Sequence, residues 1–179
     1  MLIAMAGLPG TGKTTLARSL AGSLNAIVLN KDTIRAALFP AETVEYSSEQ
    51  DDLCVEVMLQ VAAFLLKRDP DRAIILDGRT FSRQGQVQTV TQAASDMAAE
   101  LIFIECTCSE ATSLRRLRED RLREAHVAEN RDAALYHRLK GQADPLKLPH
   151  LIVDTDAPLD TVVDRCLFYL TSRRTLPVP

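Results

Sequence analysis

The sequence predicts a three-layer αβα fold in which helices cover both faces of a five-stranded parallel sheet. Five short apolar runs rich in β-branched residues alternate with amphipathic helical patterns along the chain. Parallel strands need crossover connections, and right-handed crossovers place helices on both faces of a sheet. The chain has 179 residues, of which 46% are hydrophobic and 25% charged, as in an ordinary globular domain. No repeat, low-complexity tract or linker interrupts the pattern, so we expect a single domain over residues 1–179.

The strands and helices follow from the apolar runs and the helical periodicity between them. We expect strands over residues 2–6, 26–29, 73–76, 101–105 and 151–153. We expect helices that begin near residues 12 and 32, and further helices over 48–67, 83–99, 109–123, 131–141 and 159–171. In the helix over 48–67, Ser48 and Asp51 form a capping-box pattern at the start. The apolar stripe of that helix, which we expect to face the sheet, consists of Val55, Leu59, Ala62 and Leu66.

The charge, hydropathy and cysteine content exclude several classes of protein. The net charge of −3 provides no positive field for general binding to nucleic acid. No apolar run is long enough to span a bilayer, and the first residues lack the basic flank of a signal peptide. The four cysteines have neither zinc-ligand spacing nor the pattern of a disulfide framework. We therefore expect a cytoplasmic protein with reduced thiols, of which Cys106 and Cys108 share one strand face as core residues.

Residues 7–14, with the sequence GLPGTGKT, match the phosphate-binding pattern G-x-x-x-x-G-K-[ST], the Walker A motif. The motif follows the first expected strand and opens a helix, which is the context in which backbone N–H groups surround phosphate oxygens. We expect Lys13 to reach the β- and γ-phosphates of ATP, and the Thr14 hydroxyl to bind Mg²⁺. The expected ATP-binding residues are Gly7, Gly10, Thr11, Gly12, Lys13, Thr14 and Thr15.

Asp32 and Arg35 follow the second expected strand, at the sheet edge where ligands bind in α/β proteins. Their spacing of three lets both side chains face one substrate from a helical turn. A carboxylate there can accept the proton of a hydroxyl group while the arginine holds an anion or polarises the acceptor. The alternative from position alone is that Asp32 only caps the helix.

Asp77 closes the third expected strand, so its carboxylate should emerge close to the phosphate-binding loop. From there it could orient a water bound to Mg²⁺, or the acceptor. We therefore expect Thr14 and Asp77 to be the metal-site residues.

The segment 114–123 contains five arginines and two acidic residues. At 100° per residue, Arg118 and Arg121 lie within about 40° of Leu114, whereas Arg116 and Arg123 point nearly opposite. We expect Arg118 and Arg121 to face inward, where arginines need anions and a triphosphate would supply them. The alternative is a solvated helix face with local ion pairs.

The sequence resembles the small P-loop kinases that include phage polynucleotide kinase, zeta toxins and predicted kinases of the AAA_33 type. The resemblance rests on residues 7–14, on Asn30-x-Asp32-x-x-Arg35, on the strand end at Asp77 and on the arginine-rich segment. It implies the P-loop nucleoside-triphosphate-hydrolase fold with a helical lid over about residues 114–142. It also implies that Asp32 is the base for an acceptor hydroxyl, that Arg35 assists, and that lid arginines contact ATP.

From these observations we expect a kinase that uses ATP and Mg²⁺ to phosphorylate a hydroxyl group. Only 4% of the residues are aromatic and tryptophan is absent, which favours a small-molecule acceptor over stacked nucleic-acid bases. The catalytic residues are then Lys13, Asp32 and Arg35, together with the two lid arginines. A polynucleotide 5′-hydroxyl kinase and a regulatory ATPase without kinase activity are the alternatives. We expect no membrane partner, and a monomer or a homodimer.

Overall fold

A computed structural model of the chain describes residues 1–122 and 132–174. Its sheet contains β1 (Leu2–Ala6), β2 (Ile27–Asn30), β3 (Ile74–Asp77), β4 (Leu101–Thr107) and β5 (Leu151–Asp154). The helices are α1 (Lys13–Leu24), α2 (Lys31–Leu38), α3 (Ser48–Arg68), α4 (Gln84–Asp96), α5 (Glu110–Leu122), α6 (Ala133–Gly141) and α7 (Leu159–Arg174), with a short 3₁₀ turn at Ala41–Thr43. All strand pairs are parallel and the strand order is β2-β3-β1-β4-β5. The predicted three-layer fold is confirmed.

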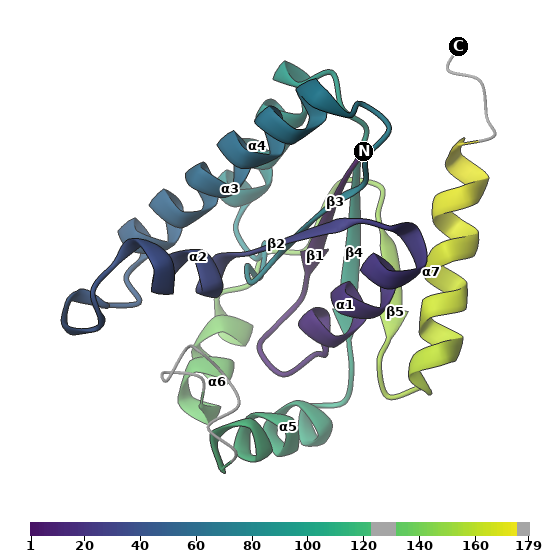
Figure 1. Cartoon of the computed structure of the whole chain (residues 1–179). Helices are drawn as coiled ribbons and strands as arrows, with labels where there is room; N and C mark the ends of the chain where they lie inside the picture. Colours follow the sequence, from purple (N-terminus) through teal and green to yellow (C-terminus); the bar gives the residue numbers. More distant parts are fainter. Residues whose placement is uncertain (123–131, 175–179) are drawn as a thin grey trace.

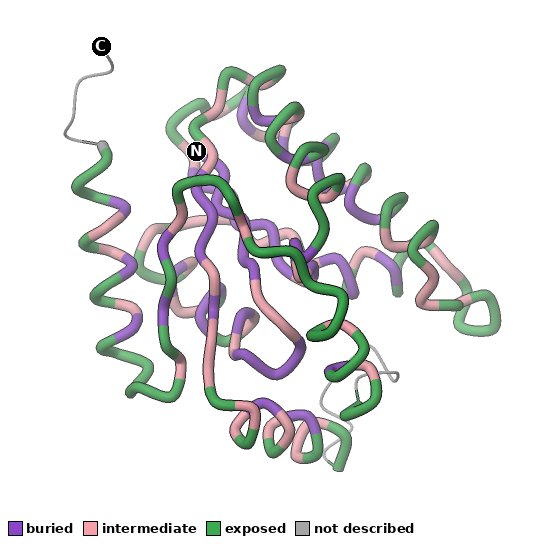
Figure 2. The backbone as a smooth tube through the Cα atoms, turned by 180° about the vertical axis from the view of Figure 1, so that it is seen from behind, coloured by how far each residue is buried: buried purple, intermediate pink, exposed green. Residues whose placement is uncertain are grey.

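Two apolar cores hold the layers together, one on each face of the sheet. Alternate residues of β1 enter opposite cores: Ile3 packs with α1 and α7, whereas Leu2 packs with α3 and α4. Figure 1 shows the two helical layers on either side of the strands, and Figure 2 shows buried residues concentrated along the strands and the inner helix faces. Because both faces are covered, the central strand β1 is buried at every position.

The helix starts differ in detail from the sequence-based prediction. Helix α3 is capped by Ser47, whose hydroxyl accepts a hydrogen bond of 3.1 Å from the Gln50 N–H group. The capping box that we predicted from Ser48 and Asp51 is therefore wrong by one residue, and Asp51 instead pairs with Lys31 and Arg35 of α2. The apolar stripe predicted for this helix is buried, as expected.

Three of the free cysteines lie in the packed interior. Cys54, Cys106 and Cys166 are buried, whereas Cys108 is half-buried. Burial raises the pKa of the Cys106 thiol to about 12 and that of Cys166 to about 11. These thiols stay protonated at neutral pH and behave as apolar core groups.

The carboxyl ends of the strands open toward α5 and α6, which lie below the sheet in Figure 1. The loops that follow β1, β2 and β3 therefore meet at one edge of the molecule. Of the helices in the described residues, none is long and apolar enough to cross a membrane.

Candidate active site

The loop between β1 and α1 is held in a fixed shape by its neighbours. The Gly7 N–H group donates a hydrogen bond of 3.0 Å to the carbonyl oxygen of Thr80, which follows β3. Gly10 has a φ of 79°, and a Cβ atom there would lie 2.6 Å from the carbonyl oxygen of Ser113 on α5. Any side chain at this position would push α5 away from the loop. The loop leads into the first turn of α1, whose N–H groups have no helical acceptor and favour anions.

The predicted phosphate-binding residues occupy distinct places around this loop. The Lys13 ammonium is buried and donates hydrogen bonds of 2.8 Å to the carbonyl oxygens of Gly7 and Leu8. The Thr11 hydroxyl donates to Leu8 at 2.8 Å, which stabilises the loop. Thr14 is half-buried and Thr15 is exposed. Lys13 thus concentrates positive charge inside the loop, where phosphate oxygens would bind.

Asp32 lies in a nearly buried cluster of opposite charges at the start of α2. Arg35 donates a hydrogen bond of 2.7 Å from Nη1 to Asp32 Oδ1, and it also contacts Asp51 on α3. Lys31 donates to Asp51 at 2.6 Å and lies 3.8 Å from Asp32. Among the described residues, no hydrogen bond reaches Asp32 Oδ2. This oxygen is therefore the one that a substrate hydroxyl can approach.

Asn30, and not Asp32, caps helix α2. Its side-chain oxygen accepts hydrogen bonds of 3.0 Å from the N–H groups of Asp32 and Thr33. The Asp32 side chain is left to interact with Arg35, so the alternative in which Asp32 only caps the helix is wrong.

Burial opposes the protonation of Lys31. Burial, together with the neighbouring cations of Arg35 and Arg79, lowers the pKa of the Lys31 ammonium to about 8. The Asp32 carboxylate acts in the opposite direction without cancelling this effect, and Asp51 is shared between Lys31 and Arg35. The lowered pKa of Lys31 thus reflects mainly its burial, because the cations of the cluster are paired with carboxylates.

Asp77 is completely buried at the end of β3, beside Asn30 of β2. The Asn30 amide donates a hydrogen bond of 2.7 Å to Asp77 Oδ2. The other oxygen, Oδ1, is buried and has no hydrogen-bond partner among the described residues. An unpaired carboxylate oxygen in this position needs a donor, and a water molecule of a hydrated cation can be that donor.

The residues present fit a magnesium ion of the kind that accompanies nucleotide phosphates. Within the described residues, no group of three His, Cys, Asp or Glu side chains is arranged to hold a metal. Mg²⁺ in phosphate-binding sites instead uses few protein ligands and keeps several waters. The Thr14 hydroxyl and the unpaired Asp77 oxygen are two groups here with suitable chemistry.

The predicted inward face of the arginine-rich helix is wrong. Arg118 and Arg121 are exposed on α5, whereas Arg116 is half-buried and contacts the loop. Arg116 donates to the Thr155 carbonyl oxygen at 2.7 Å, to the Thr155 hydroxyl at 3.0 Å and to Gly10 at 3.4 Å. The inner stripe runs through Ser113 and Leu117 instead of Leu114, which rotates the helix relative to our prediction. The ATP contacts predicted for Arg118 and Arg121 stay a prediction, and residues 123–131 of the predicted lid lie outside the described residues.

Thr155 is a site residue that the sequence reasoning missed. It directly follows β5, and its hydroxyl lies 3.0 Å from the Thr11 carbonyl oxygen and 3.1 Å from that of Thr107. Together with Arg116 it joins β5, α5 and the loop. The only sequence signal was its place after a parallel strand, at the sheet edge that carries the ligand-binding loops.

Two cavities of about 470 Å³ each meet at the loop. The first, which we call the α1 cavity, is bounded by the first turn of α1, by Arg116 and by Thr155. The predicted residues Gly10, Gly12 and Thr15 line it. The second, the α6 cavity, is bounded by α2, by the segment after β3 and by Leu135, Arg138 and Leu139 of α6. Lys13, Thr14 and Asp32 line both cavities.

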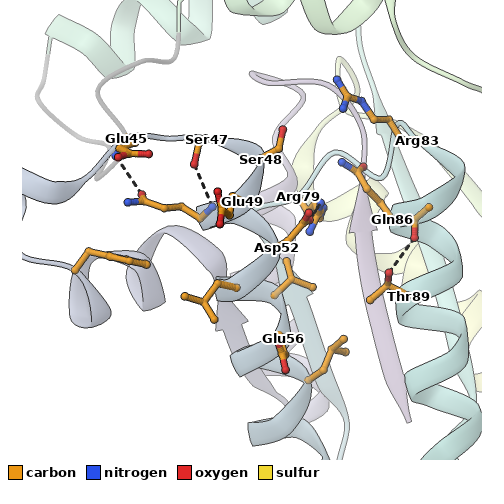
Figure 3. Close-up of a pocket in the computed structure, with 16 residues that line it drawn as sticks. Glu45, Ser47, Ser48, Glu49, Asp52, Glu56, Arg79, Arg83, Gln86 and Thr89 are labelled. Atoms are coloured by element: carbon orange, nitrogen blue, oxygen red, sulfur yellow. Dashed lines mark hydrogen bonds and ion pairs between the residues drawn. The ribbon is translucent and has the colours of Figure 1, made fainter.

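A larger groove of about 1050 Å³ continues from the α6 cavity between α3 and α4. Figure 3 shows Glu49, Asp52 and Glu56 of α3 on one side of this groove, and Gln86 and Thr89 of α4 on the other. The residues that border both the groove and the α6 cavity are Ser47, Ser48, Arg79, Arg83 and Gln86. The α6 cavity is therefore the junction between the loop and a wider open surface.

Comparisons with known proteins agree with this arrangement. The model of the AAA_33 family, described as an AAA domain, matches residues 2–146. A solved structure from Chloroflexus aurantiacus, described as a candidate kinase, aligns with a TM-score of 0.72 at 22% identity over 96% of both chains. A gluconokinase from Sinorhizobium meliloti aligns with a TM-score of 0.69 at 14% identity, over 95% of this chain and 91% of that chain. The APS kinase of Mycobacterium tuberculosis, in complex with AMPPNP and APS, aligns with a TM-score of 0.70 at 18% identity, over 95% and 96%. Identities this low show the fold alone, and no curated protein matches the sequence.

Proposed function

The chain belongs to the AAA_33 family, and we propose that it is a kinase that transfers the γ-phosphoryl group of ATP to a hydroxyl group of a small molecule. The observation that carries the proposal is the meeting of two cavities at Lys13, Thr14 and Asp32. A phosphoryl transfer needs a donor site and an acceptor site that share the reacting phosphate. The kinases among the structural neighbours, one of them bound to an ATP analogue, support the same class of reaction.

In this proposal ATP binds in the α1 cavity, with its phosphates in the loop. Lys13 and the N–H groups of the first α1 turn offset the charge of the β- and γ-phosphates. Thr14 and Asp77 would hold a magnesium ion, since a hydroxyl and an unpaired carboxylate oxygen suit that cation and its waters. The ion supplies further positive charge to the phosphates. Arg116, already fixed against the loop, adds a cation on the side of α5.

The acceptor binds in the α6 cavity with its hydroxyl at Asp32. Oδ2 of Asp32 accepts the hydroxyl proton as the acceptor oxygen bonds to the γ-phosphorus. The bond from that phosphorus to the β–γ bridging oxygen breaks, and the electron pair leaves with ADP. Arg35 is a positioning residue here, because its guanidinium holds Oδ1 of Asp32 and leaves the other oxygen for the substrate.

The size and position of the α6 cavity support a small molecule as acceptor. A volume of about 470 Å³ lies within the usual range for small-molecule sites. Its walls come from five separate parts of the chain, including α6, and Asp32 is one of the residues that line it. The net charge of −3 gives no broad positive surface for a polynucleotide.

The test is a screen for ADP release that depends on an added acceptor. Sugars, sugar acids, nucleosides, antibiotics and a 5′-hydroxyl oligonucleotide are each incubated with protein, ATP and Mg²⁺. We expect a small hydroxylated compound to stimulate ADP release and to gain one phosphoryl group by mass spectrometry. Lys13→Ala should abolish the release, because it removes the loop ammonium from the β- and γ-phosphates. Preferred labelling of the oligonucleotide, decreasing steeply with salt, would instead indicate a polynucleotide kinase.

A further inference from the structure

The α6 cavity contains more cationic than anionic side chains. Besides Lys13, the cations that line it are Lys31, Arg35, Arg79, Arg83 and Arg138. Two carboxylates, Asp32 and Asp51, line the same cavity, and a third, Asp52, contacts Arg79 from the side of the groove. Apart from Lys13, five cations and two carboxylates therefore line the cavity. A cavity lined by more cations than carboxylates has a positive potential that attracts anions.

The positive charges without a carboxylate partner belong to two particular arginines. Lys31 and Arg35 pair with Asp51, Arg35 also pairs with Asp32, and Arg79 pairs with Asp52. Arg83 and Arg138 pair with no carboxylate among the described residues. Arg83 donates a long hydrogen bond of 3.4 Å to the side-chain oxygen of Gln142. Both guanidinium groups are thus available to an anion from outside the protein.

The fold brings these two arginines to the same side of the cavity. Arg83 comes from the segment after β3, while Arg138 lies on α6 one turn before Gln142, the residue that Arg83 contacts. The N–H group of Asp144 donates a hydrogen bond of 2.9 Å to Ser82, which ties the end of α6 to the segment that carries Arg83. Arg83 and Arg138 therefore lie on two connected walls of the cavity that Asp32 also lines.

Arg79 lies between these two arginines and the buried cluster. It is 92% buried, and its Nε atom has no hydrogen-bond partner among the described residues. Gly78 allows this approach, since a Cβ atom there would lie 2.9 Å from the Lys31 Cβ and the Gly78 φ is 98°. The Arg79 guanidinium, together with that of Arg35, also lowers the pKa of Lys31. Positive charge thus continues from Lys31 through Arg79 toward Arg83.

We infer that the acceptor is an anionic alcohol, whose carboxylate, phosphate or sulfate group binds to Arg83 and Arg138 while its hydroxyl lies at Asp32. This inference rests on the proposed kinase function and defines its substrate class. Guanidinium groups suit the anion because they donate two parallel hydrogen bonds to planar or tetrahedral oxyanions. The neutral relatives of such a compound would leave both arginines without a counter-charge.

The first test compares matched pairs of alcohols that differ in one anionic group. Suitable pairs are gluconate with sorbitol, galacturonate with galactose, glycerol 3-phosphate with glycerol, and adenosine 3′-phosphate with adenosine. We expect kcat/KM for the anionic member of at least one pair to exceed that of its neutral partner by at least about tenfold. The double variant Arg83→Gln/Arg138→Gln should remove this preference and leave the KM for ATP unchanged. Arg165→Gln, which removes an exposed charge from α7, should retain the preference.

The second test measures binding without turnover. Sodium sulfate is titrated at constant ionic strength into protein saturated with AMPPNP and Mg²⁺, so that all three phosphate positions of the nucleotide are occupied. We expect the double variant to bind sulfate at least about tenfold more weakly than the wild type, with Arg165→Gln unchanged. Circular dichroism checks that the double variant is folded.

The outcomes separate this inference from the kinase proposal. Equal use of neutral and anionic alcohols would overturn the inference while leaving the kinase function intact. Equal sulfate binding by wild type and double variant, or none by the wild type, would also overturn it. Sulfate binding that depends on the arginines, without phosphorylation of any compound, would support the anion site and contradict the kinase proposal.

Discussion

At the scale of single residues, the site depends on the hydrogen-bond and ion-pair partners of the residues around Asp32. Asn30 caps α2 and Arg35 holds one oxygen of Asp32, so the other oxygen is free of hydrogen bonds within the described residues. Arg35 can do this because it is buried and also contacts Asp51. The sequence spacing suggested the pair of Asp32 and Arg35, but not the contributions of Lys31 and Asp51.

Asp32→Asn should therefore reduce catalysis without weakening nucleotide binding. The amide retains the size of the side chain but cannot accept the hydroxyl proton, so we expect kcat to decrease about 10²-fold or more. ATP affinity, measured by calorimetry, should stay within about twofold because the loop is untouched. Asp164→Asn, an exposed change on α7, is the matched control. A full rate in Asp32→Asn would exclude Asp32 as the base.

Lys31 should make stability depend on pH in an unusual direction. Its pKa is about 8 in the folded chain against an ordinary 10.5, so the unfolded chain binds more protons between these values. The free energy of unfolding of the wild type, relative to that of Lys31→Arg, should then increase between pH 8 and 10.5. The increase should be on the order of 3 kcal/mol at most. Arginine stays charged throughout, and the raised thiol pKa values contribute equally to both proteins. Urea unfolding at several pH values measures the difference, and a constant difference would contradict the account of Lys31.

At the scale of elements, α5 illustrates what periodicity can and cannot predict. The pattern correctly located a helix after β4, but two apolar positions, Leu114 and Leu117, compete for the inner face. Contacts with the loop between β1 and α1 determine which face of α5 points inward, because Gly10 packs against the Ser113 carbonyl oxygen and Arg116 reaches Thr155. Such contacts join residues far apart in the sequence, so helical spacing alone does not reveal them. The same limit applies to α3, where Asp51 pairs with Lys31 and Arg35 of α2 while Ser47 caps the helix.

Arg116→Gln should weaken the docking of α5 on the loop. It removes hydrogen bonds to the Thr155 and Gly10 carbonyl oxygens, so we expect the KM for ATP to rise about tenfold. Arg115→Gln removes an exposed arginine of the same helix, paired only with Glu119, and should have little effect. A larger rise in KM for an Arg118→Gln/Arg121→Gln variant would show that these two arginines, and not Arg116, contact ATP.

At the scale of the whole molecule, the sequence predicted the layers well because they follow from local signals. All five strands and seven helices appear near their predicted positions, since apolar runs and glycine-rich turns act over short distances. The strand order β2-β3-β1-β4-β5 carries no local signal, and neither does the meeting of two cavities at Asp32. Both arise when distant segments pack on one sheet edge, as the hydrogen bond from Gly7 to Thr80 illustrates.

The central claim is that one phosphoryl group passes between the two cavities. The most direct measurement follows the label from γ-³²P ATP in the presence of the best acceptor from the screen. We predict one labelled acceptor molecule for each ADP formed by the wild type, no labelled acceptor with Lys13→Ala, and at least about a 10²-fold slower transfer with Asp32→Asn. Release of all the label as inorganic phosphate, at a rate that no added hydroxyl compound changes, would contradict the claim and indicate a regulatory ATPase.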